Sequence, residues 1–567
     1  MKRCPECRRD YYDDSLLYCL DDGTALLDGP ASGKVDEPQT AILPGAETLK
    51  EAATRHQIHI TEKTAVLASD GPGATEPSRP NLGWLAAIAL GVVLLVGGYF
   101  GYKYLRAPGE TTINSIAVLP LENRSSDADT DYLSDGLAES LIFRLSQLPQ
   151  LKVSPTSSVM RYKGQSADVT KIAAELGVDA VMTGRLTKRG DDLNIAVELV
   201  DVRNNRSLWG EQYQRKMSDL LATQREIAAS IVQKLQVKLT GNDKGITKKY
   251  TDSNEAYQLY LNARFHFARR TKEDIAKSIE LYQRAVDIDP NFALAYSAQA
   301  EAYTVSPSFP YASPAECIPK AKAAVAKALD LDPDLPEAHT NAGMIAAIYD
   351  WDWATADREF KRALELDPNL AITHFRYAWT YLSPLGRHDQ AIEEMKKAME
   401  LEPLSLIQGA NFAGVYMYAR RYDEAIAQAK KTVDLDPTFF AGQSWLCHSY
   451  VAKGMYPEAL AIAEPTLTAP TPMLDTVAAY VGTGQRDKAV GFMTRWKESE
   501  KSKYVLNYMA AEAYTALGDK DSAIAELEKA YQNRDWFMER IKTDPNLDPL
   551  RGDPRFEAIV KRLNFPQ

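Results

Sequence analysis

The chain has 567 residues, too many for a single hydrophobic core, and this length predicts about three or four folding units. Its net charge of −11 at pH 7 argues against a nucleic-acid-binding protein, because such a protein needs a basic face. Five cysteines are too few and too unevenly spread for a secreted domain held together by disulfides.

Three of the cysteines lie near the N-terminus in a pattern typical of a metal site. Cys4 and Cys7 are two residues apart, and Cys19 repeats this spacing with Asp22 in the fourth place. Zinc prefers four tetrahedral ligands drawn from thiolates, imidazoles and carboxylates. The segment 1–27 resembles a zinc ribbon in which aspartate replaces the last cysteine. We expect a structural zinc ion there, with Asp21 as a rival fourth ligand and a degenerate ribbon without metal as the alternative.

Two segments without the sequence pattern of a folded domain follow the ribbon-like segment 1–27. Residues 28–80 are rich in glycine, proline and alanine and lack apolar periodicity, which predicts a disordered linker. Residues 82–104 contain an uncharged apolar run that would cover about 30 Å as a helix, the thickness of a bilayer core. The pattern therefore predicts one transmembrane helix. Gly97 and Gly101 form a GxxxG pair, which allows a homodimer through this span.

From residue 113 the apolar pattern changes to alternating short strands and helices. Strands are expected at 115–120, 151–155, 179–186, 193–202 and 206–217, and helices at 131–148, 168–176 and 219–239. This order predicts a small α/β domain over 113–240. Its segments SIAVLPLENRSSDADTDYLSDGLAESL, ELGVDAVMTGRL and RSLWGEQYQR resemble the TolB-like amino-terminal domain of bacterial envelope and signalling proteins.

The resemblance and the cysteines together bear on localisation. Positive charges flanking the apolar run tie, so they give no orientation. A thiolate metal site is safer in a reducing compartment. We therefore expect a single-pass protein of the bacterial inner membrane, with its N-terminus in the cytoplasm and residues 105–567 outside.

The C-terminal half carries an internal repeat. Tetrapeptides such as DLDP and ELDP place prolines at 290, 333, 368, 403 and 437, which are 43, 35, 35 and 34 residues apart. Small residues recur at fixed distances before each proline, where crossing helices need room. The pattern resembles the tetratricopeptide (TPR) family and predicts an all-α solenoid of about eight helix pairs over 253–535. Residues 536–567 are expected to form a capping segment.

In the TPR family the first helix of each pair lines a concave surface that holds a partner peptide. The residues expected to face such a partner are Tyr296, Asn341, His374, Arg376, Asn411 and His448. Each could instead be an ordinary packed or solvated helix residue.

Motifs of common catalytic sites are absent from the sequence, and the seven histidines form no nucleophile–base pattern. We therefore expect a non-enzymatic scaffold that binds or assembles envelope proteins. The alternative is the receptor half of a signalling system that relays to a cytoplasmic kinase or regulator. An enzyme would instead require a deep pocket with convergent titratable groups.

Overall fold

The computed structural model covers the whole chain and divides it into two units, residues 1–103 and residues 104–567. In the first unit it describes three two-residue strands, β1 (Lys2–Arg3), β2 (Asp10–Tyr11) and β3 (Leu27–Asp28), which pair antiparallel in the order β2-β1-β3. In the second unit it describes residues 113–125, 130–148, 150–165, 168–235, 249–269, 271–308, 312–467, 473–499 and 506–566. The expected zinc ligands and the linker 28–80 lie outside the described residues.

The expected localisation is wrong on the evidence of the described helices. None of them is both long and apolar enough to cross a bilayer. The longest, α9 (Pro314–Leu331), has 18 residues, and charged side chains such as Glu316, Lys320 and Lys322 occupy its exposed face. A single-pass inner-membrane protein is therefore not what this structure shows. The segment 82–104 and the dimer contact expected from it lie outside the described residues.

The α/β domain is built on one mixed sheet, and it confirms the expected fold class for this region. The strands are β4 (Ser115–Val118), β5 (Glu122–Asn123), β6 (Lys152–Val153), β7 (Ala180–Arg189), β8 (Asp192–Asp201) and β9 (Arg206–Lys216). Their order is β6-β4-β7-β8-β9, with β5 also paired to β7. The pairs that involve β4 and β5 are parallel, whereas β7, β8 and β9 form an antiparallel meander.

Helices cover the sheet of this domain because its strands present apolar side chains. They are α2 (Asp131–Ser146), α3 (Thr156–Met160), α4 (Val169–Leu176) and α5 (Leu220–Lys234), with a short 3-10 turn η2 (Met217–Asp219) before α5. Ile116, Val181 and Ile195 from the strands and Leu141 and Ile231 from the helices are completely buried together. Burial of apolar surface at roughly 25 cal/mol per Å² stabilises this layered core.

The domain docks directly on the first repeat. Helix α2 packs against α6 (Asn254–Arg269), where Gly136 leaves room for the Leu261 side chain. The Tyr257 hydroxyl donates to the Ser140 oxygen at 2.5 Å in the same buried interface. The α/β domain and the repeats therefore share a packed boundary.

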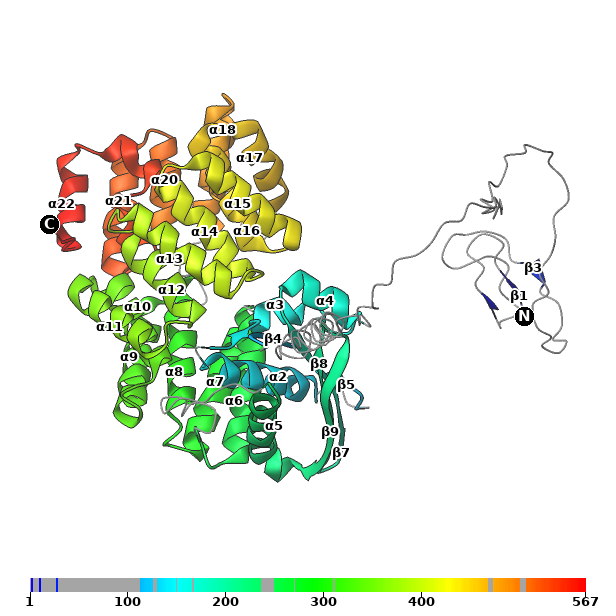
Figure 1. The fold of residues 1–567 in the computed structure, drawn as a ribbon. Helices are drawn as coiled ribbons and strands as arrows, with labels where there is room; N and C mark the ends of the chain where they lie inside the picture. The colour runs from blue at the N-terminus through cyan, green and yellow to red at the C-terminus, as the bar shows by residue number, and fades with distance from the viewer. Residues whose placement is uncertain are drawn as a thin grey trace, which may run out of the picture. The chain divides into compact units, whose positions relative to one another are not determined.

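The described part of residues 254–533 consists of antiparallel helix pairs, which confirms a TPR-like solenoid (Figure 1). The pairs are α6 with α7 (Lys272–Ile288), α8 (Ala293–Val305) with α9, α10 (Pro336–Ile345) with α11 (Trp353–Leu366), α12 (Ala371–Tyr377) with α13 (His388–Leu401), α14 (Leu406–Tyr418) with α15 (Tyr422–Leu435), α16 (Phe440–Lys453) with α17 (Tyr456–Ala463), α18 (Asp475–Gly482) with α19 (Arg486–Ser499), and α20 (Asn507–Ala516) with α21 (Lys520–Asn533). A 3-10 turn, η4 (Ser306–Ser308), extends α8, and another, η7 (Glu464–Thr466), extends α17.

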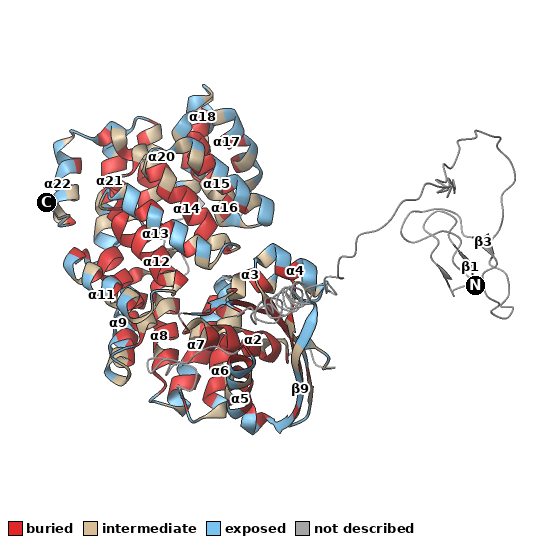
Figure 2. Cartoon of the chain, in the orientation of Figure 1, coloured by how far each residue is buried: buried red, intermediate tan, exposed pale blue. Residues whose placement is uncertain are grey.

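The small residues that mark the repeat are buried where helices cross. Ala356, Ala363, Ala391 and Ala398 have no exposed surface, and Figure 2 shows the buried faces of successive helices turned toward one another. A larger side chain at these positions would hold the helix backbones apart. Each pair thus completes the core of its neighbours.

Two inner helices end in π-helical turns. Helix α10 continues as η5 (Ala346–Asp350), and α12 continues as η6 (Ala378–Leu382). After α21 the chain forms two 3-10 turns, η8 (Met538–Arg540) and η9 (Pro545–Leu550), and the short helix α22 (Pro554–Arg562). Residues 534–566 are called the C-terminal segment below.

Candidate functional site

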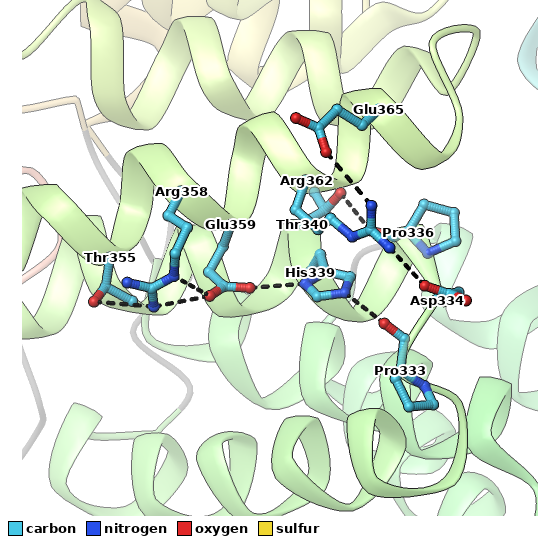
Figure 3. A network of polar contacts seen from close by, with 10 residues as sticks. All are labelled: Pro333, Asp334, Pro336, His339, Thr340, Thr355, Arg358, Glu359, Arg362 and Glu365. Atoms are coloured by element: carbon cyan, nitrogen blue, oxygen red, sulfur yellow. Dashed lines mark hydrogen bonds and ion pairs between the residues drawn. The ribbon is translucent and has the colours of Figure 1, made fainter.

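Two repeats hold their inner helices with the same histidine contact. Figure 3 shows the first: His339 Nδ1 lies 2.7 Å from Glu359 Oε2, and Nε2 lies 2.9 Å from the Pro333 carbonyl oxygen. In the next repeat His374 makes the equivalent contacts at 2.5 Å to Glu394 Oε2 and 2.8 Å to the Pro368 carbonyl oxygen. Both imidazole nitrogens are therefore used to fasten the turn before a first helix to the second helix that follows it.

The other residues expected to face a partner are also engaged within the solenoid. Asn341 donates to the Ser297 carbonyl at 3.0 Å, and Asn411 donates to the Ile407 carbonyl at 2.9 Å. Arg376 is buried with its Nη2 3.6 Å from Glu301 Oε1, and Tyr296 packs half-buried against the core. The structure does not bring these residues together at one site. Their part in partner binding stays a prediction.

The C-terminal segment contacts the ends of two inner helices through arginines. Arg540 Nη2 donates to the Trp379 carbonyl at 2.6 Å, and its guanidinium carbon lies 3.5 Å from the Trp379 ring centre. Arg534 Nη1 donates to the Tyr349 carbonyl at 2.7 Å and stacks over Trp351 at 3.9 Å. Both carbonyls belong to the π-helical turns η6 and η5. Part of the inner surface is therefore covered by the chain's own C-terminal segment.

Beyond this contact a cavity of about 360 Å³ remains between the later repeats and η9. Its walls are mostly apolar and come from α16, α18 and α20, whereas polar groups gather at one end. The apolar side chains that line it include Val451, Leu474, Ala478, Val481, Met509 and Ala513. Such a mixture of apolar walls and a few convergent polar groups is typical of a binding pocket.

The polar end is built around His448, one of the residues singled out from the sequence. His448 Nδ1 lies 2.8 Å from Asp475 Oδ1, and Nε2 lies 3.6 Å from Glu512 Oε1. The Asn546 side-chain nitrogen lies 2.6 Å from His448 Nε2 and 3.1 Å from Glu512 Oε1. Asp544 is completely buried, and its carboxylate accepts from the Tyr508 hydroxyl at 2.8 Å. The cluster joins α16, α18 and α20 to the start of η9.

Charge dominates the chemistry of this cluster. Burial acts to lower the pKa of His448, but the nearby carboxylates of Asp475, Glu512 and Asp544 outweigh it and raise that pKa to about 10. Burial and the negative charge of Asp544 raise the pKa of Glu512 well above its usual range. Three buried carboxylates thus surround one imidazole, and the cluster favours a positive charge.

Sequence reasoning selected His448 but missed its partners. Asp475, Glu512 and Asp544 lie 27, 64 and 96 residues further along the chain, so no short motif contains them. The pocket with convergent titratable groups that an enzyme would require is present here. Among the described residues that line it, however, none is serine, threonine or cysteine, the usual nucleophiles.

Comparison with known proteins supports the two-part organisation. Residues 112–234 match the family model of the HilA/YgeH-like transcriptional regulator, second domain, and residues 359–393 and 504–534 match tetratricopeptide repeat models. The region expected to be TolB-like is thus matched by a different family model. TPR repeats in the C-terminal half are confirmed.

Two curated relatives share part of the chain. It is 33% identical over 184 residues to a protein of Rhizobium meliloti (strain 1021) named "Putative adenylate cyclase 3", covering 32% of this chain and 31% of that protein. It is 24% identical over 304 residues to "Transcriptional regulator HilA" of Salmonella typhimurium, covering 52% of this chain and 53% of HilA. The chain therefore spans about a third and about half of the lengths of these relatives.

Similar solved structures include PilW, a type IV pilus biogenesis factor, with 17% identity, a TM-score of 0.30, and coverage of 37% of this chain and 93% of PilW. TolB from Acinetobacter baumannii has 19% identity, a TM-score of 0.17, and coverage of 22% of this chain and 28% of TolB.

Proposed function

We propose that this protein is a non-enzymatic scaffold whose later TPR repeats bind another protein in the cavity between α16, α18, α20 and η9. The observation that carries this proposal is that the earlier inner surface is already covered by the C-terminal segment, whereas this cavity of about 360 Å³ is open. Solenoids generally bind extended or helical peptides on such inner surfaces.

The chemistry of the cavity suggests what the partner presents. Apolar walls favour one or two aliphatic or aromatic side chains, and the acidic end favours a basic group beside them. Arg420 also lines the cavity, where it forms an ion pair of 2.7 Å with Asp548. The partner segment therefore combines an apolar anchor with a nearby lysine or arginine.

A pocket-filling substitution tests the proposal. Ala478 on α18 is half-buried at the edge of the repeat core and lines the cavity, so Ala478→Trp should block an anchor side chain, and circular dichroism checks that the repeats remain folded. The matched control is Ala323→Trp, at an exposed position of α9. Crosslinking with quantitative mass spectrometry in intact cells should show partners that fall at least about tenfold with Ala478→Trp and persist with Ala323→Trp. Equal recovery with both variants would refute the pocket as the binding site.

A second candidate is favoured by the relatives. The sequence shared with proteins named as an adenylate cyclase and a transcriptional regulator suggests an input module for a signalling system. In this alternative the repeats bind a stimulus protein, and the α/β domain passes the signal to a kinase or regulator through its packed boundary with α6. The same crosslinking experiment separates the two. Envelope or assembly proteins alone support the scaffold, and a signalling enzyme or regulator that remains crosslinked in Ala478→Trp supports the receptor.

A further inference from the structure

We propose that His448, Glu512 and Asp544 form a binding site for a divalent transition-metal ion, with Zn²⁺ as the probe, which fastens the C-terminal segment to the inner helices. One ligand atom from each of the three side chains lies within 4.8 Å of the others. They come from α16, from α20 and from the residue before η9, so a bound ion would join parts of the chain that are far apart in sequence.

The distances suit a small ion after minor adjustment. Ligand atoms about 2.1 Å from a tetrahedral zinc ion lie about 3.4 Å from one another. His448 Nε2 and Glu512 Oε1 are already 3.6 Å apart. Asp544 Oδ1 accepts from the Asn546 backbone N–H at 2.8 Å and Oδ2 accepts from the Tyr508 hydroxyl at 2.8 Å, and each oxygen keeps a second lone pair for the ion. One imidazole and two carboxylates are ligands that Zn²⁺ and Mn²⁺ both accept.

The orientation of His448 supports metal binding independently of the ligand distances. Its Nδ1 atom faces buried Asp475 at 2.8 Å and its Nε2 atom faces Glu512 at 3.6 Å, so an ion that replaces the proton on Nε2 leaves the contact of Nδ1 with Asp475 intact. A carboxylate that holds the second nitrogen of a metal-ligating histidine is the usual outer-shell arrangement of such sites. His339 and His374 differ, because their Nε2 atoms are occupied by proline carbonyl oxygens.

The side chain of Asn546 supplies a fourth ligand. Its nitrogen is 2.6 Å from His448 Nε2 and 3.1 Å from Glu512 Oε1, so the amide lies between the two metal-ligating groups. Rotation of the amide by 180° exchanges its nitrogen and oxygen, which are distinguished only by their hydrogen-bond partners. In the rotated state, and after a shift that lengthens the 2.6 Å contact with His448 Nε2 toward the ~3.4 Å between two zinc ligands, Oδ1 faces the ion. The neighbouring cavity gives the ion a route from solvent.

Charge also favours a cation here. Asp475, Glu512 and Asp544 bring three carboxylates into a region where the only cationic group within hydrogen-bond distance in the described structure is the imidazole of His448. Buried carboxylates without compensation are costly. A divalent ion would offset this negative charge.

The experiment uses the full chain with Cys4→Ser, Cys7→Ser and Cys19→Ser, which removes the zinc binding expected at the N-terminus. Isothermal titration calorimetry with Zn²⁺ should then show one equivalent bound. Glu512→Gln and Asp544→Asn should each abolish this binding, and Asp475→Asn should weaken it about 10- to 100-fold because it acts through His448. The matched control is His374→Gln, which should bind Zn²⁺ like the parent.

Circular dichroism measures whether each variant keeps the helical content of the parent. Glu512→Gln preserves shape and the amide contact, so a helical content equal to that of the parent shows that lost zinc binding reports a lost ligand. Should Asp544→Asn fail to fold, Glu512→Gln and Asp475→Asn still give the required comparison. Absence of zinc binding in the cysteine-free parent, or unchanged binding in Glu512→Gln, would overturn the proposal.

Discussion

The contact of Arg540 with Trp379 gives a quantitative test of how the C-terminal segment is held. Arg540 is completely buried, donates to the Trp379 carbonyl at 2.6 Å and stacks on the indole ring at 3.5 Å. A hydrogen bond from a charged group contributes about 1.5–3 kcal/mol, and a desolvated cation–π contact contributes about 2 kcal/mol. Arg540→Ala should therefore destabilise the closed state of the segment by about 4 kcal/mol.

Amide hydrogen exchange measures this change locally, which matters because long repeat arrays often unfold in several steps. A loss of about 4 kcal/mol corresponds to roughly a 1,000-fold faster exchange of amides in residues 535–550. Arg540→Lys keeps the charge but loses the planar stack, so we expect about half of the free-energy loss. Amides elsewhere in the chain should keep their parent exchange rates.

Arg555→Ala is the control, because Arg555 is more than half exposed and forms ion pairs with Asp553 and Asp521. Ion pairs exposed to solvent contribute little to stability. Arg540→Ala should accelerate amide exchange in residues 535–550 at least about tenfold more than Arg555→Ala does. A smaller difference would refute the free energy assigned to the Arg540 contact. That outcome would mean that apolar packing alone holds the segment.

Three further predictions concern other contacts. Gly136→Leu should loosen the boundary between α2 and α6 by about 1–3 kcal/mol, since a new Cβ would lie 3.0 Å from Leu261, and limited proteolysis should then release the α/β domain sooner. Gly414→Ala would place a Cβ atom 2.7 Å from the Trp379 ring, so exchange of the C-terminal segment should rise by about 10-fold or more. Burial raises the pKa of Glu402 to about 7, so the folded state binds more protons than the unfolded state between about pH 4.5 and 7, and stability contributed by Glu402 falls as pH rises through this window. Urea titrations of Glu402→Gln at several pH values should lack that fall.

The repeats could be predicted from the sequence because their cause is local and periodic. Prolines and small residues recur at a nearly constant interval, and Ala356 and Ala363 are fully buried where the pattern placed crossing helices. The alternation of strands and helices in the α/β domain was likewise visible, because apolar side chains change period between the two kinds of element.

The inner surface could not be predicted in the same way. A single repeat suggests that Asn341 and Arg376 face a partner, yet both are buried against an earlier repeat. No sequence pattern predicts the contacts of the arginines in the C-terminal segment, and Arg540 meets Trp379 across 161 residues of sequence. Long-range contacts of this kind depend on how far the solenoid turns, which a repeat consensus does not contain.

A proline explains why Arg540 contacts the inner helix at the repeat that contains Trp379. In the π-helical turn η6 the Ser383 amide donates to the Ala378 carbonyl, five residues back. The residue five positions after Trp379 is Pro384, which has no N–H to donate. The Trp379 carbonyl is therefore left for another donor at the end of its helix, where such oxygens need partners. A guanidinium fits this place better than an ammonium, because it donates in its own plane while that plane stacks on the indole ring. The proline that ends the inner helix thus leaves the Trp379 carbonyl to the arginine of the C-terminal segment.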